Sequence, residues 1–221
     1  MPAVTAHFED LLGSTRVVPV ITIADADAAV PLAEALVAGG LPVLEITLRT
    51  EAGLESIARI AEMVPQAIVG AGTVTTPQQL RDARNAGARF IVSPGCTDAL
   101  AAAAAEAGGA FLPGAVTASE VLRLLEHGIS FMKFFPAETS GGVVALKALA
   151  GPFPGIRFCP TGGIDLARAH DYLALANVVC VGGTWMVPTG LIAAGDWDAI
   201  TRLAAEASAA TSLPVSASAE A

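Results

Sequence analysis

Lys133 lies in a segment where a charged side chain is unexpected. Its chain neighbours are Phe131, Met132, Phe134 and Phe135. An ammonium group in such surroundings has to lose its charge, pair with an anion, or extend its head to water. A lysine that loses its charge becomes a nucleophilic amine, which Schiff-base chemistry requires. The alternative is a structural lysine whose apolar stem covers a strand edge while its ammonium reaches solvent.

A carboxylate also lies inside an apolar strand-like segment, Pro42–Leu48. Side chains alternate between the two faces of a strand, so Glu45, Thr47 and Arg49 share one side. Because this polar set cannot face packed helices, we expect it to face the same interior as Lys133. A carboxylate there is costly unless it is paired or used. The alternative is a structural ion pair between Glu45 and Arg49.

The phenylalanines and Glu45 have opposite effects on the pKa of Lys133. From a reference pKa near 10.4, roughly one lysine amine in a thousand is neutral at pH 7.4. Desolvation by the surrounding phenylalanines lowers the pKa, whereas an ionised Glu45 close by raises it. For nucleophilic attack the first effect has to dominate. We therefore expect Glu45 to act across a gap or through a water molecule, and not to form a tight salt bridge.

Two glycine pairs, Gly162-Gly163 and Gly182-Gly183, follow the last two strand-like segments. Barrels bind phosphate after their seventh and eighth strands, using backbone N–H groups. Glycine pairs also occur in plain turns. Their position after two consecutive strands favours an anion site, to which Thr184 adds a hydroxyl donor. The third and fourth strand-like segments end in Gly70–Thr73 and Ser93–Gly95, which would bring further backbone and hydroxyl groups to the same rim.

Short β-rich segments alternate with Ala/Leu-rich segments of helical period. The strand candidates are Val17–Ile23, Pro42–Leu48, Ala67–Gly70, Arg89–Val92, Ala110–Leu112, Ile129–Phe134, Ile156–Cys159 and Val178–Val181. The helix candidates are residues 26–38, 51–63, 76–86, 97–107, 117–127, 141–150 and 165–175. Alternating strands and helices predict an α/β fold with a parallel sheet, and eight strands close a (β/α)8 TIM barrel. An open doubly wound sheet is the competing architecture, but no GxGxxG follows the first strand.

The chain is expected to form one domain, a (β/α)8 barrel over residues 1–210. Residues 5–13 are predicted to form a short N-terminal helix that covers the bottom of the barrel. The segment 211–221 is small and polar, and a disordered tail is expected there.

Composition excludes several classes of function. Of the 221 residues, 53% are hydrophobic and 15% charged, and the net charge is −9 with no long basic patch, which argues against nucleic acid. An anionic small molecule remains compatible, because its site needs only one or two cations and backbone N–H groups. Residues 172–195 carry no charge but are interrupted by glycine, proline and asparagine, so no membrane span is predicted.

Cysteine and histidine usage bears on location and metals. The three cysteines are widely spaced without a CxxC, which favours reduced thiols in a cytoplasmic protein. No basic-then-apolar signal segment is recognised near the acidic Glu9 and Asp10. The three histidines form no HxH or HExxH pattern, so no metal site is expected.

Six segments together resemble the 2-keto-3-deoxy-6-phosphogluconate (KDPG) aldolases, a family that includes enzymes acting on 4-hydroxy-2-oxoglutarate and on the galactonate epimer. The segments are Glu45–Thr50, Gly70–Thr73, Ser93–Gly95, Lys133–Glu138, Pro160–Ile164 and Gly182–Trp185. The resemblance extends from about residue 16 to 207. It implies a cofactor-free class I (Schiff-base) aldolase, usually a homotrimer. Such an enzyme cleaves KDPG to pyruvate and glyceraldehyde 3-phosphate, with 4-hydroxy-2-oxoglutarate as a further candidate substrate.

The resemblance also implies residue roles. Lys133 matches the Schiff-base lysine, and Glu45 matches the general acid and base. Residues matching the binding site for the pyruvoyl end are Arg49, Thr73, Pro94 and Phe135. Thr161 matches a position beside the substrate hydroxyl. Residues matching the phosphate site are Gly162, Gly163, Gly183 and Thr184, the last of which is often serine in the family.

Three other functions remain open at this point. A phosphosugar isomerase or epimerase on the same barrel would share the phosphate loops but would not need Lys133. A non-catalytic sugar-phosphate binding protein would need neither Lys133 nor Glu45 as reactive groups. A metal-dependent aldolase would lose activity on chelation.

Overall fold

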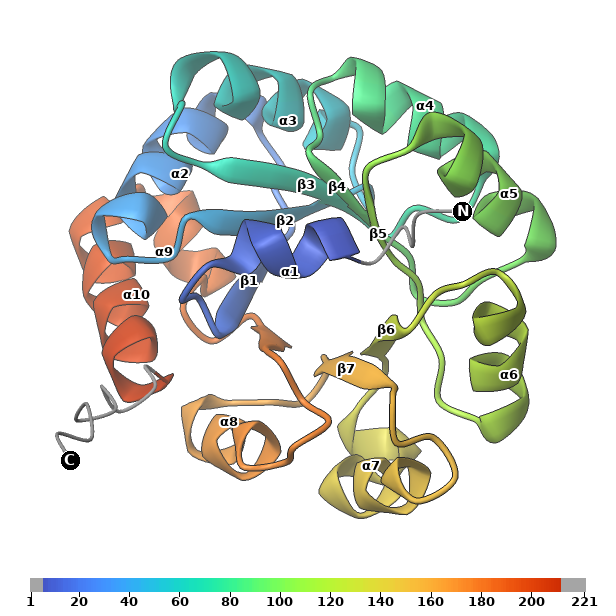
Figure 1. Cartoon of the computed structure of the whole chain (residues 1–221). Coiled ribbons are helices and arrows are strands. Elements are labelled where there is room, and N and C mark those ends of the chain that lie inside the picture. Colours follow the sequence, from blue (N-terminus) through green and yellow to red (C-terminus); the bar gives the residue numbers. More distant parts are fainter. Residues whose placement is uncertain (1–5, 212–221) are drawn as a thin grey trace, which may run out of the picture.

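The computed structural model describes residues 6–211, with side chains from Phe8 onward, and shows central strands surrounded by helices (Figure 1). The strands are β1 Val17–Ile21, β2 Val43–Thr47, β3 Ile68–Gly72, β4 Phe90–Val92, β5 Ala110–Leu112, β6 Phe131–Phe134, β7 Arg157–Pro160 and β8 Val181–Gly183. The helices are α1 Ala6–Leu12, α2 Ala29–Ala38, α3 Ala52–Met63, α4 Pro77–Asn85, α5 Asp98–Ala107, α6 Ala118–Glu126, α7 Gly142–Ala150, α8 Leu166–Leu173, α9 Thr189–Ala194 and α10 Trp197–Thr211, with short 3-10 turns at Ala26–Ala28 and Glu138–Ser140. The predicted α/β alternation is confirmed.

The strands form a curled parallel sheet of six, in the order β5-β4-β3-β2-β1-β8, and a separate parallel pair, β6-β7. Single bridges, Gly114 to Lys133 and Thr161 to Gly182, join the pair to the two edges of the larger sheet. The predicted continuous eight-stranded barrel is therefore observed only in part. Pro113, directly after β5, has no N–H to donate, although its carbonyl accepts from the Lys133 N–H at 2.8 Å. Regular pairing between β5 and β6 is limited for this reason.

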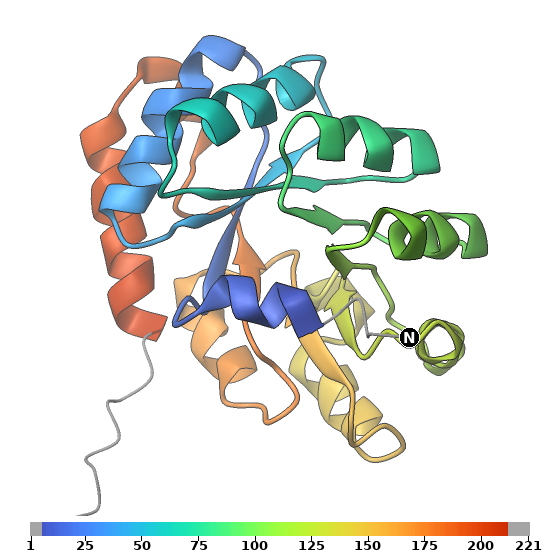
Figure 2. The same ribbon diagram turned by 45° about the horizontal axis from the view of Figure 1, so that its top comes forward.

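Helix α1 lies across one end of the strands (Figure 2). Its Phe8 ring packs edge-on against Phe90 and Phe131, with centroids 5.1 and 5.5 Å apart. Phe90 and Phe131 are the first residues of β4 and β6. The covered end is therefore the amino end of the strands, as predicted for this helix, and the opposite end carries the polar loops.

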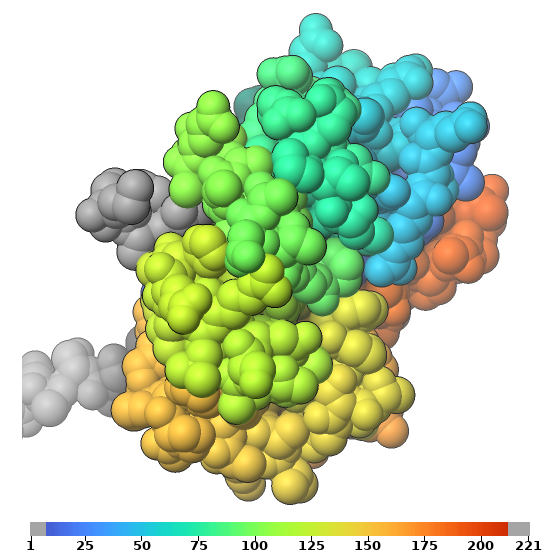
Figure 3. Space-filling model, turned by 90° about the vertical axis from the view of Figure 1, so that its right-hand side faces the viewer, coloured from blue at the N-terminus to red at the C-terminus, as the bar shows by residue number. Residues whose placement is uncertain are grey.

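The interior and the helix layer form two apolar clusters, and strand alternation separates them. Val43 and Phe131 belong to the interior cluster around Phe8, whereas Leu44 and Met132 pack among the helices. This confirms that Glu45 and Lys133, on the same faces as Val43 and Phe131, point inward. Figure 3 shows the outer wall, where α5, α6 and α7 lie over the strands.

Local sequence signals correctly predicted where several helices begin. Thr76 accepts a hydrogen bond from the Gln79 N–H, and Thr117 with Glu120 forms a reciprocal capping box. By contrast, the long α10 was not among the predicted helices. Its buried residues Ile200, Ala204, Ala207 and Thr211 recur at helical spacing, and it packs through small groups: a Cβ added to Gly39 would lie 2.4 Å from the Ala204 Cβ.

Several predicted boundaries differ from the observed ones; the first strand, for example, ends at Ile21 and not at Ile23. The last strand was predicted at Val178–Val181 but is Val181–Gly183, because regular pairing with β1 begins at Val181 while Val178 makes only an isolated bridge to Phe158. Thr211, assigned to the tail, is the last residue of α10, where its hydroxyl donates to the Ala207 carbonyl at 2.7 Å. Residues 212–221 lie outside the described part, so the predicted disorder there stays a prediction. Between residues 6 and 211, no helix is long and apolar enough to cross a bilayer.

Candidate active site

Lys133 and Glu45 meet inside the sheet, although they lie 88 residues apart. The Lys133 Nζ donates to Glu45 Oε1 at 3.0 Å and to Oε2 at 3.3 Å. The two residues are 4% and 3% exposed. The alternative of a lysine extending to water is therefore wrong. The alternative of a Glu45–Arg49 ion pair is also not what the structure shows, because the Glu45 carboxylate holds Lys133.

The direct contact corrects the expectation that Glu45 would act across a gap or a water. Both groups are enclosed by apolar walls, where a separated ammonium and carboxylate would each remain unpaired at a cost of several kcal/mol. The pair therefore closes to hydrogen-bond distance. The arrangement also gives the lysine a base in direct contact, so one proton transfer from Nζ to Glu45 leaves a neutral amine.

Gly72 makes room for this pair. It is the last residue of β3, next to β2, and a Cβ added there would lie 2.2 Å from Glu45 Oε1 and 2.6 Å from Glu45 Cγ. No side chain can occupy the position while Glu45 keeps its place. A glycine inside a strand often marks such a close approach, and this signal could have identified Gly72 from the sequence.

Gly72→Ala is expected to lower kcat/KM about 100-fold, because the methyl group displaces the Glu45 carboxylate by an ångström or more. Steady-state pyruvate release measures the effect. The matched control is Gly155→Ala, since a Cβ at Gly155 meets nothing within 4 Å and its φ is not in the left-handed region. Equal activities of the two variants would contradict the role assigned to Gly72.

Arg49 and Thr73 form a second polar contact at the open end. The Arg49 Nε donates to Thr73 Oγ1 at 3.0 Å. Thr73 has a φ of 59°, a left-handed conformation that β-branched residues rarely adopt. Strained residues of this kind are concentrated at binding and catalytic sites. Because the bond to Thr73 uses Nε, the two Nη groups of Arg49 stay available to an anionic ligand.

A cavity of about 200 Å³ lies above the lysine. It is lined by Val20, Arg49, Lys133, Phe135, Thr161, Gly162, Gly163, Ile164, Gly182, Gly183 and Thr184. The Phe135 ring lies 5.4 Å from the Lys133 Nζ and forms part of the wall. The structure thus brings most of the predicted residues to one cavity, with both glycine pairs on its rim.

Glu45, Thr73 and Pro94 are not among the residues that line the cavity, but all three lie beside it. Glu45 contacts the Lys133 Nζ. Thr73 holds Arg49. The Pro94 carbonyl packs against Gly114, where an added Cβ would lie 2.1 Å from the oxygen, and Gly114 bridges to Lys133. The prediction missed Val20, Ile164 and the lining role of Gly182. Gly182 packs against Thr161, since a Cβ there would lie 2.3 Å from the threonine Oγ1.

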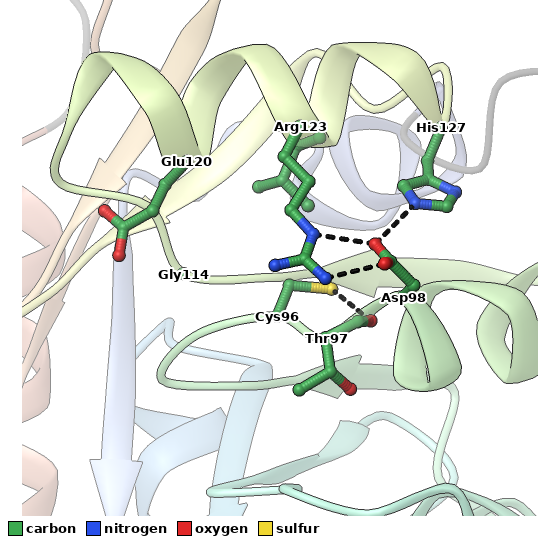
Figure 4. Close-up of a pocket in the computed structure, with 8 residues that line it drawn as sticks. Cys96, Thr97, Asp98, Gly114, Glu120, Arg123 and His127 are labelled. Carbon is green, nitrogen blue, oxygen red and sulfur yellow. Dashed lines mark hydrogen bonds and ion pairs between the residues drawn. The ribbon is translucent and has the colours of Figure 1, made fainter.

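A different pocket, of about 130 Å³, lies between the start of α5 and the outer face of α6 (Figure 4). Its charged groups bind one another: Asp98 accepts from Arg123 at 2.7 Å and contacts His127 Nε2 at 3.3 Å. Burial raises the pKa of the Cys96 thiol to about 11. The thiol is therefore protonated near neutral pH and is a poor nucleophile. The residues that line this pocket include no lysine, unlike those that line the Lys133 cavity.

The Asp98 cluster gives a pH prediction. Hydrogen bonds from Arg123 and then His127 lower the pKa of Asp98 to about 2. A carboxyl with a lowered folded-state pKa adds stability that is fully present above its unfolded value near 4 and is lost as pH falls toward 2. The difference in melting temperature between the intact chain and Asp98→Asn should therefore be small at pH 7, because the group is exposed, and should vanish toward pH 2. A difference that grew on acidification would contradict this assignment.

The side chains that could ligate a metal do not gather at one place between residues 6 and 211. No group of three or more His, Cys, Asp or Glu side chains in this range could hold a metal ion. The polar groups at the cavity and directly below it are instead an amine, a carboxylate, a guanidinium and backbone N–H groups.

Known proteins of similar sequence and fold identify the family of this chain. The sequence profile described as KDPG and KHG aldolase matches residues 8–203. The KHG/KDPG aldolase of Escherichia coli (strain K12) is 54% identical, over 90% of this chain and 93% of its own. A KDPG aldolase from Legionella pneumophila, solved with pyruvate captured as a covalent carbinolamine, superposes with a TM-score of 0.88 at 44% identity, over 90% of this chain and 97% of its own. The 2-keto-3-deoxy-6-phosphogluconate aldolase of Zymomonas mobilis ZM4 with 3-phosphoglycerate gives a TM-score of 0.86 at 48% identity, over 91% and 95%. Because the family profile matches residues 8–203 and the relatives match nearly the whole chain, this protein belongs to the KDPG and KHG aldolase family.

Proposed function

We propose that this chain is a class I aldolase that cleaves 2-dehydro-3-deoxy-6-phosphogluconate (KDPG) to pyruvate and glyceraldehyde 3-phosphate. The observation that carries the proposal is the buried contact of Lys133 Nζ with Glu45 at 3.0 Å, below a cavity rimmed by two glycine pairs. An amine and a base in contact can form and hydrolyse a Schiff base without any cofactor. The captured carbinolamine of the Legionella protein supports this chemistry.

The first half of the reaction forms the iminium. Glu45 takes a proton from the Lys133 ammonium, and the neutral Nζ attacks the C2 carbon of the keto acid. As the N–C bond forms, protonated Glu45 gives its proton to the C2 oxygen, which becomes the hydroxyl of a carbinolamine. Glu45 then takes one proton from the attacking nitrogen, which had become cationic. Protonated Glu45 then gives its proton to this hydroxyl, which leaves as water. The resulting iminium attracts the electrons of the neighbouring bonds.

The second half breaks the carbon–carbon bond. Glu45 accepts the proton of the C4 hydroxyl, the C3–C4 bond breaks, and its electron pair moves to form an enamine on Lys133 while the aldehyde leaves. Protonated Glu45 then returns a proton to C3, and water hydrolyses the iminium to release pyruvate. One carboxylate in contact with the lysine therefore serves every proton transfer.

The remaining cavity residues account for orientation. Arg49, held by Thr73, is placed to bind the carboxylate of the keto acid, and Phe135 covers the pyruvoyl end. Thr161 would lie beside the C4 hydroxyl. The loops Gly162-Gly163 and Gly183-Thr184 would bind the phosphate, which the 3-phosphoglycerate complex of the Zymomonas protein supports.

We include 4-hydroxy-2-oxoglutarate, cleaved to pyruvate and glyoxylate, as a second substrate. The Escherichia coli relative carries both activities in its name. This substrate shares the keto-acid half that Lys133 and Arg49 would bind, but it ends in a carboxylate at C5, where KDPG continues with a hydroxyl-bearing carbon and a phosphorylated carbon. A coupled assay of pyruvate release from KDPG, its galactonate epimer and 4-hydroxy-2-oxoglutarate determines the preference.

Covalent trapping tests the function directly. Borohydride with pyruvate should add a reduced pyruvate mass to Lys133, located by peptide mass spectrometry, and KDPG should be turned over to pyruvate. Absence of the adduct would favour a phosphosugar isomerase. Substrate binding without turnover would favour a binding protein. Loss of activity with EDTA would favour a metal-dependent aldolase. Each of these outcomes would overturn the proposal.

The proposed function goes with a closed barrel, an oligomeric state, a pathway and a location in the cell. The curled sheet and the β6-β7 pair, joined by single bridges at both junctions, support a closed (β/α)8 barrel as one domain over residues 1–210. The family resemblance supports a homotrimer acting in the Entner–Doudoroff pathway in the cytoplasm, on a phosphorylated keto acid and without nucleic acid or membrane partners. Light scattering of the purified chain measures the oligomeric state.

A further inference from the structure

The loop Thr161–Ile164, which rims the cavity after β7, is held from behind by three hydrogen bonds to consecutive carbonyl groups. The Ala137 N–H donates to the Thr161 carbonyl at 2.8 Å, and the Glu138 N–H donates to the Gly162 carbonyl at 3.2 Å. Arg168 Nη1 donates to the Gly163 carbonyl at 3.2 Å. All three carbonyl groups therefore point toward the 3-10 turn Glu138–Ser140 and the start of α8.

The N–H groups of this loop must then point the other way. The peptides between Thr161 and Ile164 are trans. In a trans peptide the carbonyl of one residue and the N–H of the next point in opposite directions. The N–H groups of Gly162, Gly163 and Ile164 therefore turn away from these donors. The bridge between Thr161 and Gly182 directs the Gly162 N–H toward the Gly182 carbonyl, whereas the N–H groups of Gly163 and Ile164 have no hydrogen-bond acceptor within the described residues. All three residues line the cavity. Successive free N–H groups of this kind form a concave anion site.

Glu138 is the centre of the support behind the loop. Its Oε2 lies 3.4 Å from Arg168 Nε, and its Oε1 accepts a short hydrogen bond from the Tyr172 hydroxyl. Arg168 and Tyr172 are four residues apart on α8, so both reach the same carboxylate from one helix face. Burial and the neighbouring Glu138 raise the pKa of Tyr172, which keeps the hydroxyl a donor.

The support also needs Gly163 to be glycine. Its φ is 77°, and a Cβ added there would lie 2.7 Å from Glu138 Cγ. The loop backbone thus rests directly on the Glu138 side chain. A change in the place of this side chain would move the loop and rotate its peptides.

We propose that Glu138, Arg168 and Tyr172 are positioning residues that orient the N–H groups of Gly163 and Ile164 toward the phosphate of the substrate. None of the three touches the reacting carbons. They set the affinity for the phosphorylated end of the keto acid, whereas Lys133 and Glu45 set the chemistry at the other end. This inference rests on the proposed function.

The test compares substrates with and without a phosphate. In Glu138→Gln and Arg168→Ala, the KM for KDPG and the inhibition constant of inorganic phosphate should rise about 10-fold, the effect typical of losing a charged supporting group. The kcat, and the rate of borohydride trapping with pyruvate, should stay within about twofold, because pyruvate makes no use of the loop. Tyr172→Phe should show a smaller rise in KM, since Arg168 still holds the carboxylate, and Arg168→Lys should recover part of the affinity.

The matched control is Arg123→Ala. Arg123 also binds a carboxylate, and its side chain is 50% exposed compared with 53% for Arg168, but it lies on the outer face of α6. Arg123→Ala should leave the KM for KDPG and the inhibition constant of inorganic phosphate unchanged. The inference is overturned if the positioning variants leave the KM for KDPG unchanged, or if they lower turnover and trapping in parallel, as a loss of folding would. Failure of the intact chain to trap pyruvate would instead overturn the proposed function, so the two failures are distinguishable.

Discussion

Lys133→Met is expected to abolish cleavage of KDPG, lowering kcat/KM by about 10⁵-fold or more. Methionine has nearly the same length and fills the same space, but it has no nitrogen to form the carbinolamine. Removal of a covalent nucleophile typically costs on the order of 10⁶ in kcat, and the carboxylate and phosphate contacts that remain cannot replace it. Pyruvate release and borohydride trapping should both fall to background.

The same substitution should also destabilise the fold. It leaves the Glu45 carboxylate, which is 3% exposed, without its partner, and breaking a buried pair in this way costs about 3–5 kcal/mol. The double variant Lys133→Met/Glu45→Gln removes both charges and should recover most of that loss in chemical denaturation, while remaining inactive. Recovery of stability without activity separates the structural role of the pair from its chemical role.

Lys147→Met is the control for Lys133. Lys147 is the other lysine of the chain and is exposed on α7. The control variant should retain both activity and stability. If Lys133→Met kept more than about one hundredth of the activity, the Schiff-base mechanism would be excluded, because no uncatalysed route approaches that rate.

Glu45→Gln is expected to lower kcat by about 10² to 10⁴, the usual contribution of a positioned acid and base. Glutamine keeps the shape and one hydrogen bond to Lys133, but it cannot accept the ammonium proton or the proton of the C4 hydroxyl. Because Arg49 and the glycine loops are untouched, KM should change little. Steady-state kinetics measure kcat and KM separately. A single-turnover trapping experiment should show slower formation of the pyruvate adduct.

A matched control for Glu45 is Glu55→Gln. Glu55 also forms an ion pair, with Arg59 at 2.6 Å, but this pair is exposed on α3. It should leave kcat unchanged. If Glu45→Gln formed the adduct and released pyruvate at the rate of the intact chain, a different base would have to be sought, and Glu45 would be a structural counter-ion only.

Much of the fold could be predicted because its signals are local. Thr76 and Thr117 begin helices through hydrogen bonds to residues three positions on, and such signals need no knowledge of the rest of the chain. Strand alternation correctly assigned Glu45 and Lys133 to the interior, since the face of a residue depends only on its position in the strand. Helix α10 was missed although its buried residues Ile200, Ala204 and Ala207 recur at helical spacing, a local signal that could have predicted it.

The regular closure of the sheet could not be predicted in the same way. Eight strand-like segments suggested a continuous barrel, but whether neighbouring strands pair along several residues depends on their lengths and free N–H groups. Pro113 and the three-residue strands β5 and β8 limit the pairing at the junctions. These effects arise only when two strands are laid side by side.

By itself, the sequence determined which residues could react and on which strands they lie: an amine among phenylalanines, a carboxylate on an inward face, and glycine pairs at the ends of the last two strands. The tertiary structure decided how these groups meet. It brought Lys133 and Glu45 into direct contact where a gap was expected. It also left no room for a side chain at Gly72 beside Glu45, and it held Thr73 in a left-handed conformation against Arg49. The reason is physical: residue type and alternation are local properties of a chain, whereas the distance between two side chains across an interior is set by the curvature of the sheet and by everything packed around it.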